Sequence, residues 1–397
     1  MATKTPMQLS VSTKAQNAGA TVPPAPELGL TPPVTPTVED DSPAETGATL
    51  PRVVGDAHNR DQTPAVSGSL QFSDQLEYQL DQEGHRIEFG RGAWSVVHKA
   101  FSSPRVDSGS PPFTPPSSPT PSSRLVAVKS PARRDACAVL QAEALTLSRA
   151  RSVTGSENHV VRFHGYIADS NSLVLSAVPL SLSTYIEDKA RLAEKNITTR
   201  NMREPVQGMR QWHDLAKKLI TGLLWLHSDA QIVHGDIKPH NVLLKPRMSI
   251  DQEANSTTDF PYDPLFADFS SSHPITTSEK SLGAASTALT PPFTAPELLS
   301  SLLSSPGTPP TPASDVFSLA VTLLSAATGD LLLYPSQRCL LMSRDGHQVI
   351  NFVQLGQNGT RVPKNGTVEK ILKPAVAKNA VERIKPSDWL RLAQTVA

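Results

Sequence analysis

The stretch Ile232-Val-His-Gly-Asp-Ile-Lys-Pro-His-Asn-Val-Leu-Leu244 places three chemical groups in a short loop between two apolar segments. These are the carboxylate of Asp236, the ammonium of Lys238 and the amide of Asn241. Phosphoryl transfer needs little covalent help but strict positioning and neutralisation of charge. Asp236 can orient a hydroxyl and take up its proton, Lys238 can hold phosphoryl oxygens, and Asn241 can bind Mg²⁺. The loop therefore predicts phosphoryl transfer, and the alternative is a surface turn of ordinary polar residues.

The order of these residues resembles the catalytic loop of eukaryotic protein kinases, H-R-D-x-K-x-x-N. Here it begins His234, Gly235, Asp236, so it is similar to the variants that lack arginine before the aspartate (non-RD). Lys238 is the form found in serine/threonine kinases. The resemblance implies an α+β, bilobal fold with a small β-rich N-lobe, a larger helical C-lobe, and ATP and Mg²⁺ in the cleft between them. It also implies protein substrates that are phosphorylated on Ser or Thr.

Composition and charge argue against several other classes of protein. The chain has 37 Lys and Arg against 37 Asp and Glu, so no basic surface for nucleic acid or an anionic membrane is indicated. Cys137 and Cys339 lack metal-ligand spacing and are too few for a disulfide framework, which suits a reducing compartment. No run reaches the roughly 18 apolar residues that a membrane helix needs. We expect an intracellular protein, cytoplasmic or nuclear, without nucleic-acid partners or membrane insertion.

Most of the 36 prolines lie in the first 65 residues, in 104–121 and in 291–312. Such segments bury too little apolar surface to offset the entropy of ordering. Their Ser-Pro and Thr-Pro pairs are either acceptors for proline-directed kinases or chance dipeptides in solvated segments. The long tail and inserts resemble those of fungal kinases.

The expected domain organisation follows from this distribution of proline. We expect a disordered tail over 1–75 and a kinase domain over 76–397. Within the domain, the N-lobe is expected over 76–178 with a disordered insertion at 102–123, and the C-lobe over 179–397.

A glycine turn between two strands precedes the first insertion. Glycines let backbone N–H groups approach phosphate oxygens closely. The turn resembles the kinase glycine loop G-x-G-x-x-G-x-V at Gly90, Gly92 and Val97, with Ser95 in place of the third glycine. Trp94 at the tip is either an aromatic of the flap or an exposed turn residue.

A lysine and a glutamate in the following segments are expected to pair. The strand Leu125–Lys129 places Ala127 and Lys129 on one face. In the helix expected over 134–149, Glu143 falls on the apolar face, where an unpaired charge is costly. A pair between Lys129 and Glu143 resolves both burials, whereas either residue alone would be an ordinary solvated charge. By resemblance to the family's V-A-x-K motif, Lys129 also holds ATP phosphates.

The resemblance implies the remaining contacts to nucleotide and metal. Leu175 would be the gatekeeper, and Ser176–Val178 the hinge that binds adenine through backbone groups. The run Leu265-Phe-Ala-Asp-Phe-Ser270 is similar to the D-F-G segment, with Asp268 as a second Mg²⁺ ligand and Ser270 restricting a flip of the segment. The expected catalytic residues are Asp236, Lys238, Lys129 and Glu143, and the metal ligands are Asn241 and Asp268. The expected nucleotide-binding residues are Gly90, Gly92, Val97, Ala127, Lys129, Ser176, Val178 and Leu243.

Later motifs occur in family order. Thr290-Pro-Pro-Phe-Thr-Ala-Pro-Glu297 resembles T-x-x-Y-x-A-P-E, in which the threonine contacts Asp236 and Lys238. Glu297 would pair with Arg383. Asp315 would cap the next helix and hold the backbone of the catalytic loop.

Three departures, Ser95, Gly235 and Ser270, leave an alternative open: a nucleotide-binding scaffold without transfer activity. A pure protein-interaction module would explain the Pro-rich segments but not the ordered motifs. Gly235 also removes the arginine that contacts a phosphorylated activation segment. We therefore expect activity that does not depend on phosphorylation at Ser278, Ser281, Ser286 or Thr287. The alternative is that another cation, such as Lys280 or Arg162, replaces the arginine.

Overall fold

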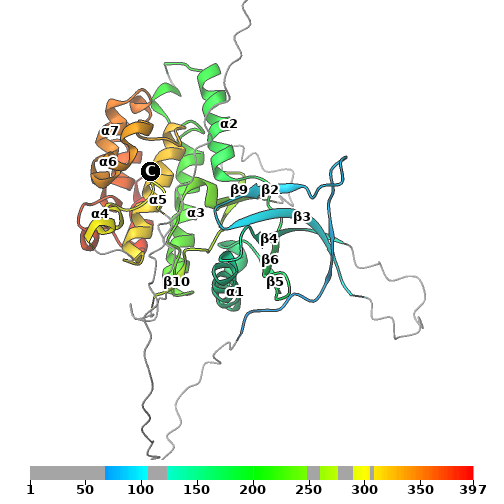
Figure 1. Cartoon of the computed structure of the whole chain (residues 1–397). Helices are drawn as coiled ribbons and strands as arrows, with labels where there is room; N and C mark the ends of the chain where they lie inside the picture. The colour runs from blue at the N-terminus through cyan, green and yellow to red at the C-terminus, as the bar shows by residue number, and fades with distance from the viewer. Residues whose placement is uncertain are drawn as a thin grey trace, which may run out of the picture.

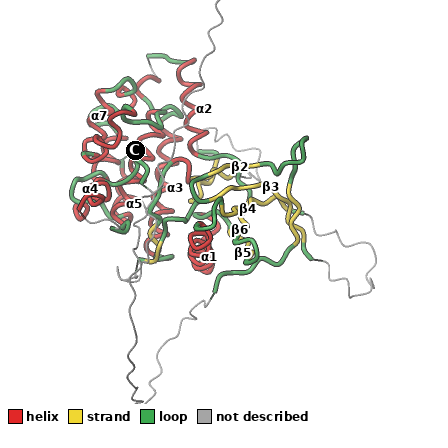
Figure 2. Tube along the Cα trace, in the orientation of Figure 1, coloured by secondary structure: helices red, strands yellow, loops and turns green. Residues whose placement is uncertain are grey.

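A β-sheet and a group of helices lie side by side in the chain, with the sheet first in sequence (Figure 1). The computed structural model describes residues 68–105, 123–199, 201–247, 260–275, 289–304 and 308–396. Residues 1–67 of the expected tail and 106–122 of the expected insertion lie outside these ranges. Figure 2 separates the strands of the N-terminal part from the helices of the C-terminal part. The predicted α+β, bilobal fold is confirmed.

The N-lobe is an antiparallel sheet that one helix accompanies. Within the described residues its strand order is β1-β3-β4-β6-β5, with β2 paired to β3. Helix α1 connects β4 to β5 and contacts both. The register pairs Val97 with Lys129 and Ala127 with Leu175, so these residues come from neighbouring strands of one sheet. The bounds are β1 Gln75–Tyr78, β2 Glu88–Arg91, β3 Ser95–Ser103, β4 Arg124–Pro131, α1 Ala136–Ser152, β5 Phe163–Ile167 and β6 Ser172–Ser176.

The N-lobe begins earlier than the boundary expected at residue 76. The N–H of Leu70 donates to Ser148 Oγ at 2.8 Å, and the N–H of Phe72 donates to the carbonyl of Tyr166 at 3.0 Å. Gly165 lets this segment approach, because an added Cβ there would lie 2.6 Å from the Phe72 nitrogen. Backbone pairing and a glycine therefore attach residues that composition alone assigned to the tail.

The expected insertion also begins later than residue 102. Strand β3 continues to Ser103, and Ser102 is paired with Arg124 at the start of β4. Ser102 is buried, and its hydroxyl donates to Asp74 at 3.0 Å. Two residues of the expected insertion are therefore part of the sheet.

The C-lobe is built around helix α5. All residues from Ser314 to Thr328 in this helix are buried, and Trp212 Nε1 of α3 donates to the Leu323 carbonyl at 2.9 Å. The bounds are α2 Leu182–Lys195, α3 Met209–Ser228, β7 Ile232–Val233, β8 Val242–Pro246, β9 Tyr262–Phe266, β10 His273–Pro274, α4 Pro296–Ser304, α5 Pro312–Thr328, α6 Cys339–Arg344, α7 Val349–Leu355, α8 Thr367–Leu372 and α9 Pro386–Thr395.

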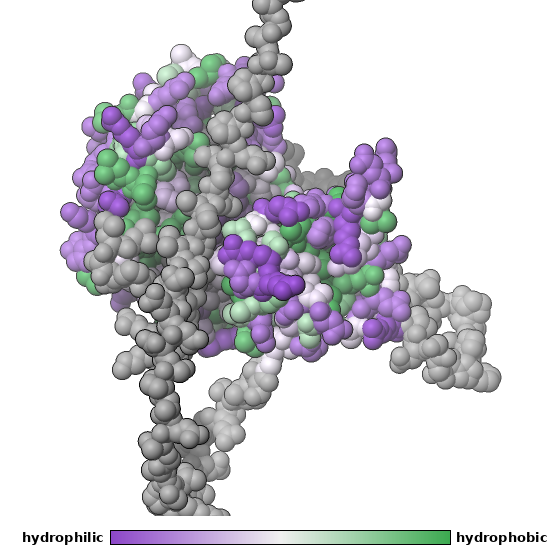
Figure 3. Space-filling model, in the orientation of Figure 1, coloured by the Kyte–Doolittle hydropathy of each residue, from purple (hydrophilic) through white to green (hydrophobic). Residues whose placement is uncertain are grey.

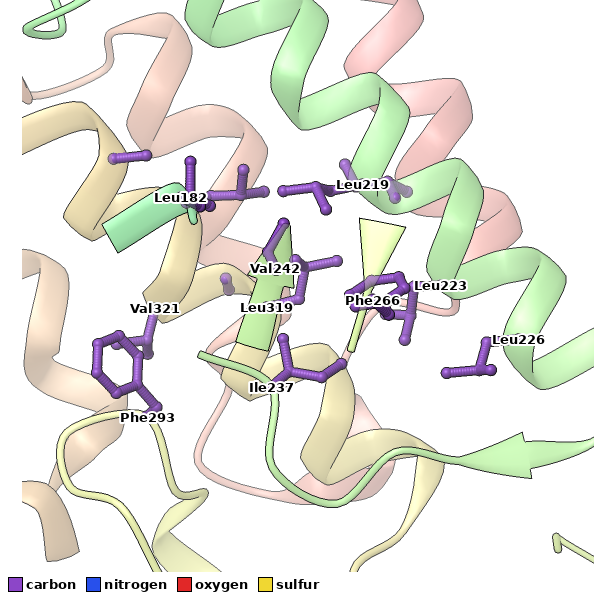
Figure 4. Close-up of a cluster of buried hydrophobic side chains, with 14 of the residues drawn as sticks. Leu182, Leu219, Leu223, Leu226, Ile237, Val242, Phe266, Phe293, Leu319 and Val321 are labelled. Carbon is purple, nitrogen blue, oxygen red and sulfur yellow. The ribbon is translucent and has the colours of Figure 1, made fainter. Parts of the chain in front are cut away.

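The core of the C-lobe lies directly beneath the loop that carries Asp236. Figure 4 shows Ile237 and Val242 close to Phe266 and the leucines of α3. Ile237 is buried although both of its neighbours in sequence are charged. Burial of this side chain fixes the loop, so the charged groups on either side of it have defined positions.

Figure 3 shows hydrophilic and hydrophobic residues mixed over the sheet, and an apolar area over the helices. Exposed leucines of the helical part include Leu332, Leu340 and Leu341. No helix in the described part of the chain is long and apolar enough to cross a membrane.

Candidate active site

The catalytic loop lies between two short antiparallel pairs. On its N-terminal side β7 pairs with β10, with Val233 opposite His273. On its C-terminal side β8 pairs with β9, with Val242 opposite Phe266. The catalytic loop, between Val233 and Val242, is thus held at both ends by strands that follow it in sequence.

Asp236 is the centre of a hydrogen-bonded group inside this loop. Lys238 Nζ donates to Asp236 Oδ2 at 2.7 Å, and Asn241 Nδ2 donates to the same oxygen at 3.0 Å. Thr290 Oγ1 donates to Oδ1 at 3.2 Å and accepts from Lys238 at 3.1 Å. The predicted contact of Thr290 with both charged residues is therefore confirmed.

Burial raises the pKa of Asp236 above its usual range, and the charge of Lys238 opposes the rise. The side chain is surrounded by protein, with only 7% of the residue exposed. A carboxylate with a raised pKa is a better proton acceptor than a solvated aspartate. The positive charge of Lys238 limits that rise by stabilising the ionised form.

Asp315 of α5 holds the backbone at the start of the loop, as predicted. Its Oδ2 accepts from the N–H of His234 at 2.8 Å, and its Oδ1 accepts from the N–H of Gly235 at 2.9 Å. His227 Nε2 of α3 lies 3.0 Å from Oδ2. Three elements therefore meet at one buried carboxylate.

The predicted capping role of Asp315 is wrong. Helix α5 begins at Pro312, and its cap is Thr311, whose hydroxyl accepts from the Ser314 N–H at 3.2 Å. Ser314 Oγ in turn accepts from the Thr311 N–H at 2.8 Å, which completes a capping box. Asp315 lies in the first turn of the helix, so its side chain is available to the loop.

The predicted pair between β4 and α1 forms. Lys129 Nζ donates to both oxygens of Glu143, at 2.8 and 2.7 Å, and to Asp268 Oδ1 at 2.7 Å. Glu143 Oε1 also accepts from the Phe269 N–H at 3.1 Å. The pair therefore connects the sheet, α1 and the segment that follows β9.

Burial and the opposite charges of this cluster shift the pKa values of its three groups in different directions. Burial acts to lower the pKa of Lys129, but the carboxylates of Asp268 and Glu143 outweigh it and raise the pKa. Burial acts to raise the pKa of Asp268, and the charge of Lys129 outweighs it, so that pKa falls well below its usual range. For Glu143, burial raises the pKa against the opposing effect of Lys129.

The predicted pair at the start of α4 also forms. Arg383 donates from Nη1 to Glu297 Oε1 at 2.7 Å and from Nη2 to Oε2 at 2.6 Å. Arg383 is buried and also donates to the carbonyls of Ala377 and Ala313. This two-pronged geometry fixes the Thr290–Glu297 segment against the C-terminal part of the chain.

A family model, described as protein kinase domain, matches residues 120–391, more than half of the chain. The chain belongs to the protein kinase domain family. Kinases of this family transfer a phosphoryl group from ATP to protein substrates. The match begins after the glycine turn, so that turn rests on the sequence and the structure alone. No curated protein matches the chain.

The apolar residues that the resemblance gave as nucleotide-binding residues or as the gatekeeper lie on both lobes of this kinase. Ala127 and Leu175 are neighbours across β4 and β6, and Val97 and Leu243 pack partly buried against the main core. Within the described residues, the backbone N–H and C=O of Val178 have no hydrogen-bond partner. They are available to a ligand.

Ser176, the other expected hinge contact, is more occupied. Its N–H donates to the carbonyl of Arg162 at 2.9 Å, and its hydroxyl lies 3.0 Å from His164 Nε2. Neither of these two groups is free for a nucleotide.

Gly90 and Gly92 are exposed, and the fold itself does not require glycine at either position. Neither is among the described residues with positive φ, and an added Cβ at either one would meet nothing within 4 Å. The turn is closed by the Gly92 N–H, which donates to the Ser95 carbonyl at 2.8 Å. A ligand that approaches the backbone closely would account for the two glycines, which fits a phosphate group.

Trp94 is neither fully exposed nor free. It is half-buried, and the guanidinium carbon of Arg133 lies 4.2 Å from the centre of its ring. Its carbonyl accepts from the Ala132 N–H at 2.9 Å. These contacts join the tip of the glycine turn to the segment after β4.

The residues expected to hold metal have oxygens that suit Mg²⁺. Asn241 Nδ2 is engaged with the carbonyl and the carboxylate of Asp236, which leaves the amide oxygen for a ligand. No group of three or more His, Cys, Asp or Glu residues in the described part of the chain could hold a metal ion alone.

Ser270 replaces the glycine of D-F-G without strain in this conformation. Asp268 has the left-handed backbone, with φ of 62°, whereas Ser270 is not among the described residues with positive φ. A hydrogen bond from the Ser270 side chain adds to the effect of Lys129 in lowering the pKa of Asp268. The expected restriction on flipping of the segment stays a prediction.

Sequence reasoning missed several contacts of the site. The bond from Lys129 to Asp268 and the bond from His227 to Asp315 join residues 139 and 88 positions apart. No local pattern indicates either contact, because the first depends on how β4 meets the segment after β9, and the second on how α3 meets α5.

Proposed function

We propose that this kinase is active and transfers the γ-phosphoryl group of Mg-ATP to Ser and Thr hydroxyls of proteins. We further propose that it does so without a phosphate on its activation segment. The observation that carries the proposal is the arrangement at Asp236, where Lys238, Asn241 and Thr290 all bond to one carboxylate. Positioning of this kind is most of what phosphoryl transfer asks of a protein.

In this proposal ATP supplies the phosphoryl group, and Mg²⁺ neutralises charge on its phosphates. Lys129 binds the phosphates, supported by Glu143, and Asn241 and Asp268 hold the metal. Val97, Ala127, Leu243 and the backbone of Val178 receive the adenine, with Gly90 and Gly92 over the phosphates.

The proton of the substrate hydroxyl goes to Asp236. Among the described residues Oδ1 accepts one hydrogen bond, from Thr290 at 3.2 Å. A carboxylate oxygen can accept two bonds, so Oδ1 retains capacity for the hydroxyl that attacks. Lys238, 2.7 Å from Oδ2, places a positive charge beside the reacting groups. The preference for Ser and Thr is supported by this lysine, two residues after the aspartate.

The alternative, a nucleotide-binding scaffold, is favoured by one observation. Ser95 is buried where the family has its third glycine, and the turn around it is closed by a hydrogen bond. A turn fixed in this way would cover the phosphates less tightly. Such a turn would weaken the binding of ATP, whereas the groups around Asp236 that serve phosphoryl transfer are retained.

Two measurements on the purified chain separate these functions. We expect Mg-ATP to raise the melting temperature, and labelled phosphate to appear on Ser and Thr of a generic basic protein. Lys129→Met should abolish most transfer and weaken the thermal shift, because it removes the buried cation. Lys245→Met, at an exposed position of β8, is the matched control and should match the parent.

A thermal shift without transfer would support the scaffold and contradict the proposal. Label on Tyr alone would contradict the proposed preference for Ser and Thr.

A further inference from the structure

Gly235 lies where two other segments of the chain meet the catalytic loop. Its φ is 83°, and an added Cβ would lie 2.5 Å from the Ser271 carbonyl oxygen and 3.1 Å from Pro310 Cγ. The first contact is with backbone, which cannot rotate away. No side chain fits at this position, so the arginine that most relatives carry there is excluded by packing in this fold.

His273 and Pro310 join these two segments to each other. His273 Nε2 lies 2.9 Å from the Pro310 carbonyl oxygen, and both residues are buried. A carbonyl only accepts, and His273 Nδ1 also lies 3.1 Å from a carbonyl oxygen, that of Pro274. A neutral ring has one hydrogen, and we assign it to Nε2, which makes the shorter contact. His273 belongs to β10 and is paired with Val233, the residue before the catalytic loop.

Pro310 is fixed in turn by the start of α5. Thr311 caps the helix, and Pro312 occupies its first turn. The same helix contributes Asp315, which holds the N–H of Gly235 at 2.9 Å. The start of α5 therefore holds Gly235 through Asp315. Pro310 and Ser271 pack against the Cα of Gly235.

We propose that His273 and Pro310 are positioning residues for Asp236. Their hydrogen bond locks β10 and the start of α5 around Gly235, and so sets the loop without a phosphorylated activation segment. Pro310, which precedes the cap of α5, then helps to position the catalytic loop. This inference rests on the proposed function, because its consequence for rate requires an active kinase.

The first test compares His273→Phe with His273→Gln in steady-state transfer to a peptide. Phenylalanine fills the ring volume without a donor, whereas the glutamine amide can still donate to the Pro310 carbonyl. We expect His273→Phe to lower kcat by about 10- to 100-fold, as loss of alignment does, with KM for ATP within about twofold. Glutamine should restore most of kcat. His85→Phe, at an exposed histidine, should match the parent.

The second test reads the loop itself and does not need activity. In His273→Phe, amide hydrogens of residues 232–236 should exchange faster than in the parent, and in His273→Gln close to the parent rate. Unchanged exchange in His273→Phe would overturn the inference, even if the parent shows no transfer. In an active parent, a kcat within twofold for His273→Phe, or no recovery with glutamine, would also overturn it. An inactive parent with faster exchange in His273→Phe would refute the proposed function. The inference that His273 and Pro310 position the catalytic loop would still hold.

Discussion

The catalytic loop and the glycine turn both carry glycine, but the two regions surround it differently. At Gly235 the carbonyl of Ser271 and the ring of Pro310 leave no room for a side chain. At Gly90 and Gly92 a side chain would meet nothing. The first glycine is needed by the fold, whereas the fold does not require the other two, for which we propose a ligand that comes close to the backbone.

The polar groups of the two regions differ in the same way. Around Asp236 the contacts come from the loop itself, from Thr290 and, through the backbone, from Asp315. The glycine turn is held by strand pairing, one closing hydrogen bond and the contact of Trp94 with Arg133. The groups proposed to handle the proton and the charge are thus held by several parts of the fold, while the turn proposed to cover the phosphates depends less on the rest of the fold.

The largest effect is expected at the centre of the catalytic loop. Asp236→Asn keeps the shape but removes the proton acceptor, so transfer should fall by a factor on the order of 10³. The thermal shift with Mg-ATP should remain, because the asparagine leaves Lys129 and Asp268 in place. Asp229→Asn, at an exposed position after α3, is the control. Equal transfer rates in Asp236→Asn and the parent would show that Asp236 is not the proton acceptor.

A smaller effect, on the free energy of unfolding, is expected at Gly235. Gly235→Ala should lower the free energy of unfolding by more than about 1–2 kcal/mol, since positive φ and a clash with backbone act together. Gly84→Ala is a matched control, because Gly84 has the same φ of 83° but nothing within 4 Å of an added Cβ. Denaturant unfolding of the two variants separates strain from crowding. Equal losses would show that Ser271 and Pro310 yield to a side chain.

At Gly92 we expect no loss of stability, in contrast to Gly235. Gly92→Ala should leave the free energy of unfolding unchanged or raise it by up to about 1 kcal/mol, because φ is ordinary and the space is free. Its KM for ATP should rise by roughly three- to tenfold, since a Cβ keeps phosphate from the backbone. Gly68→Ala, also in open space, is the control for stability. An unchanged KM would show that the turn does not meet the nucleotide.

The sequence predicted those parts of the site that depend on local spacing. The period of α1 placed Glu143 on its buried face, which predicted the pair with Lys129. The spacing within the catalytic loop brought Asp236, Lys238 and Asn241 together. In each case the residue types and the geometry of one element suffice.

The rest depends on how distant elements meet. The contact of His273 with the Pro310 carbonyl involves a backbone acceptor, which residue type does not reveal. The N-lobe starts before residue 76 because Leu70 and Phe72 pair through their backbone, in a segment with no marked apolar pattern. The cap expected at Asp315 is four residues later than the actual cap, Thr311, because a proline-rich run does not by itself indicate a helix, although proline is well suited to the first turn.

The central claim is that the catalytic loop is set by the fold and not by a phosphate. The hydroxyl residues Ser278, Ser281, Ser286 and Thr287 lie outside the described residues. The deciding measurement is the transfer rate after phosphatase treatment, with phosphate removal checked by mass, beside a variant with all four residues changed to Ala. Thr290 is kept, because it bonds to Asp236. We predict rates within about threefold of the untreated parent, which is under ~1 kcal/mol of barrier. A hundredfold fall that a second kinase restores would contradict the claim.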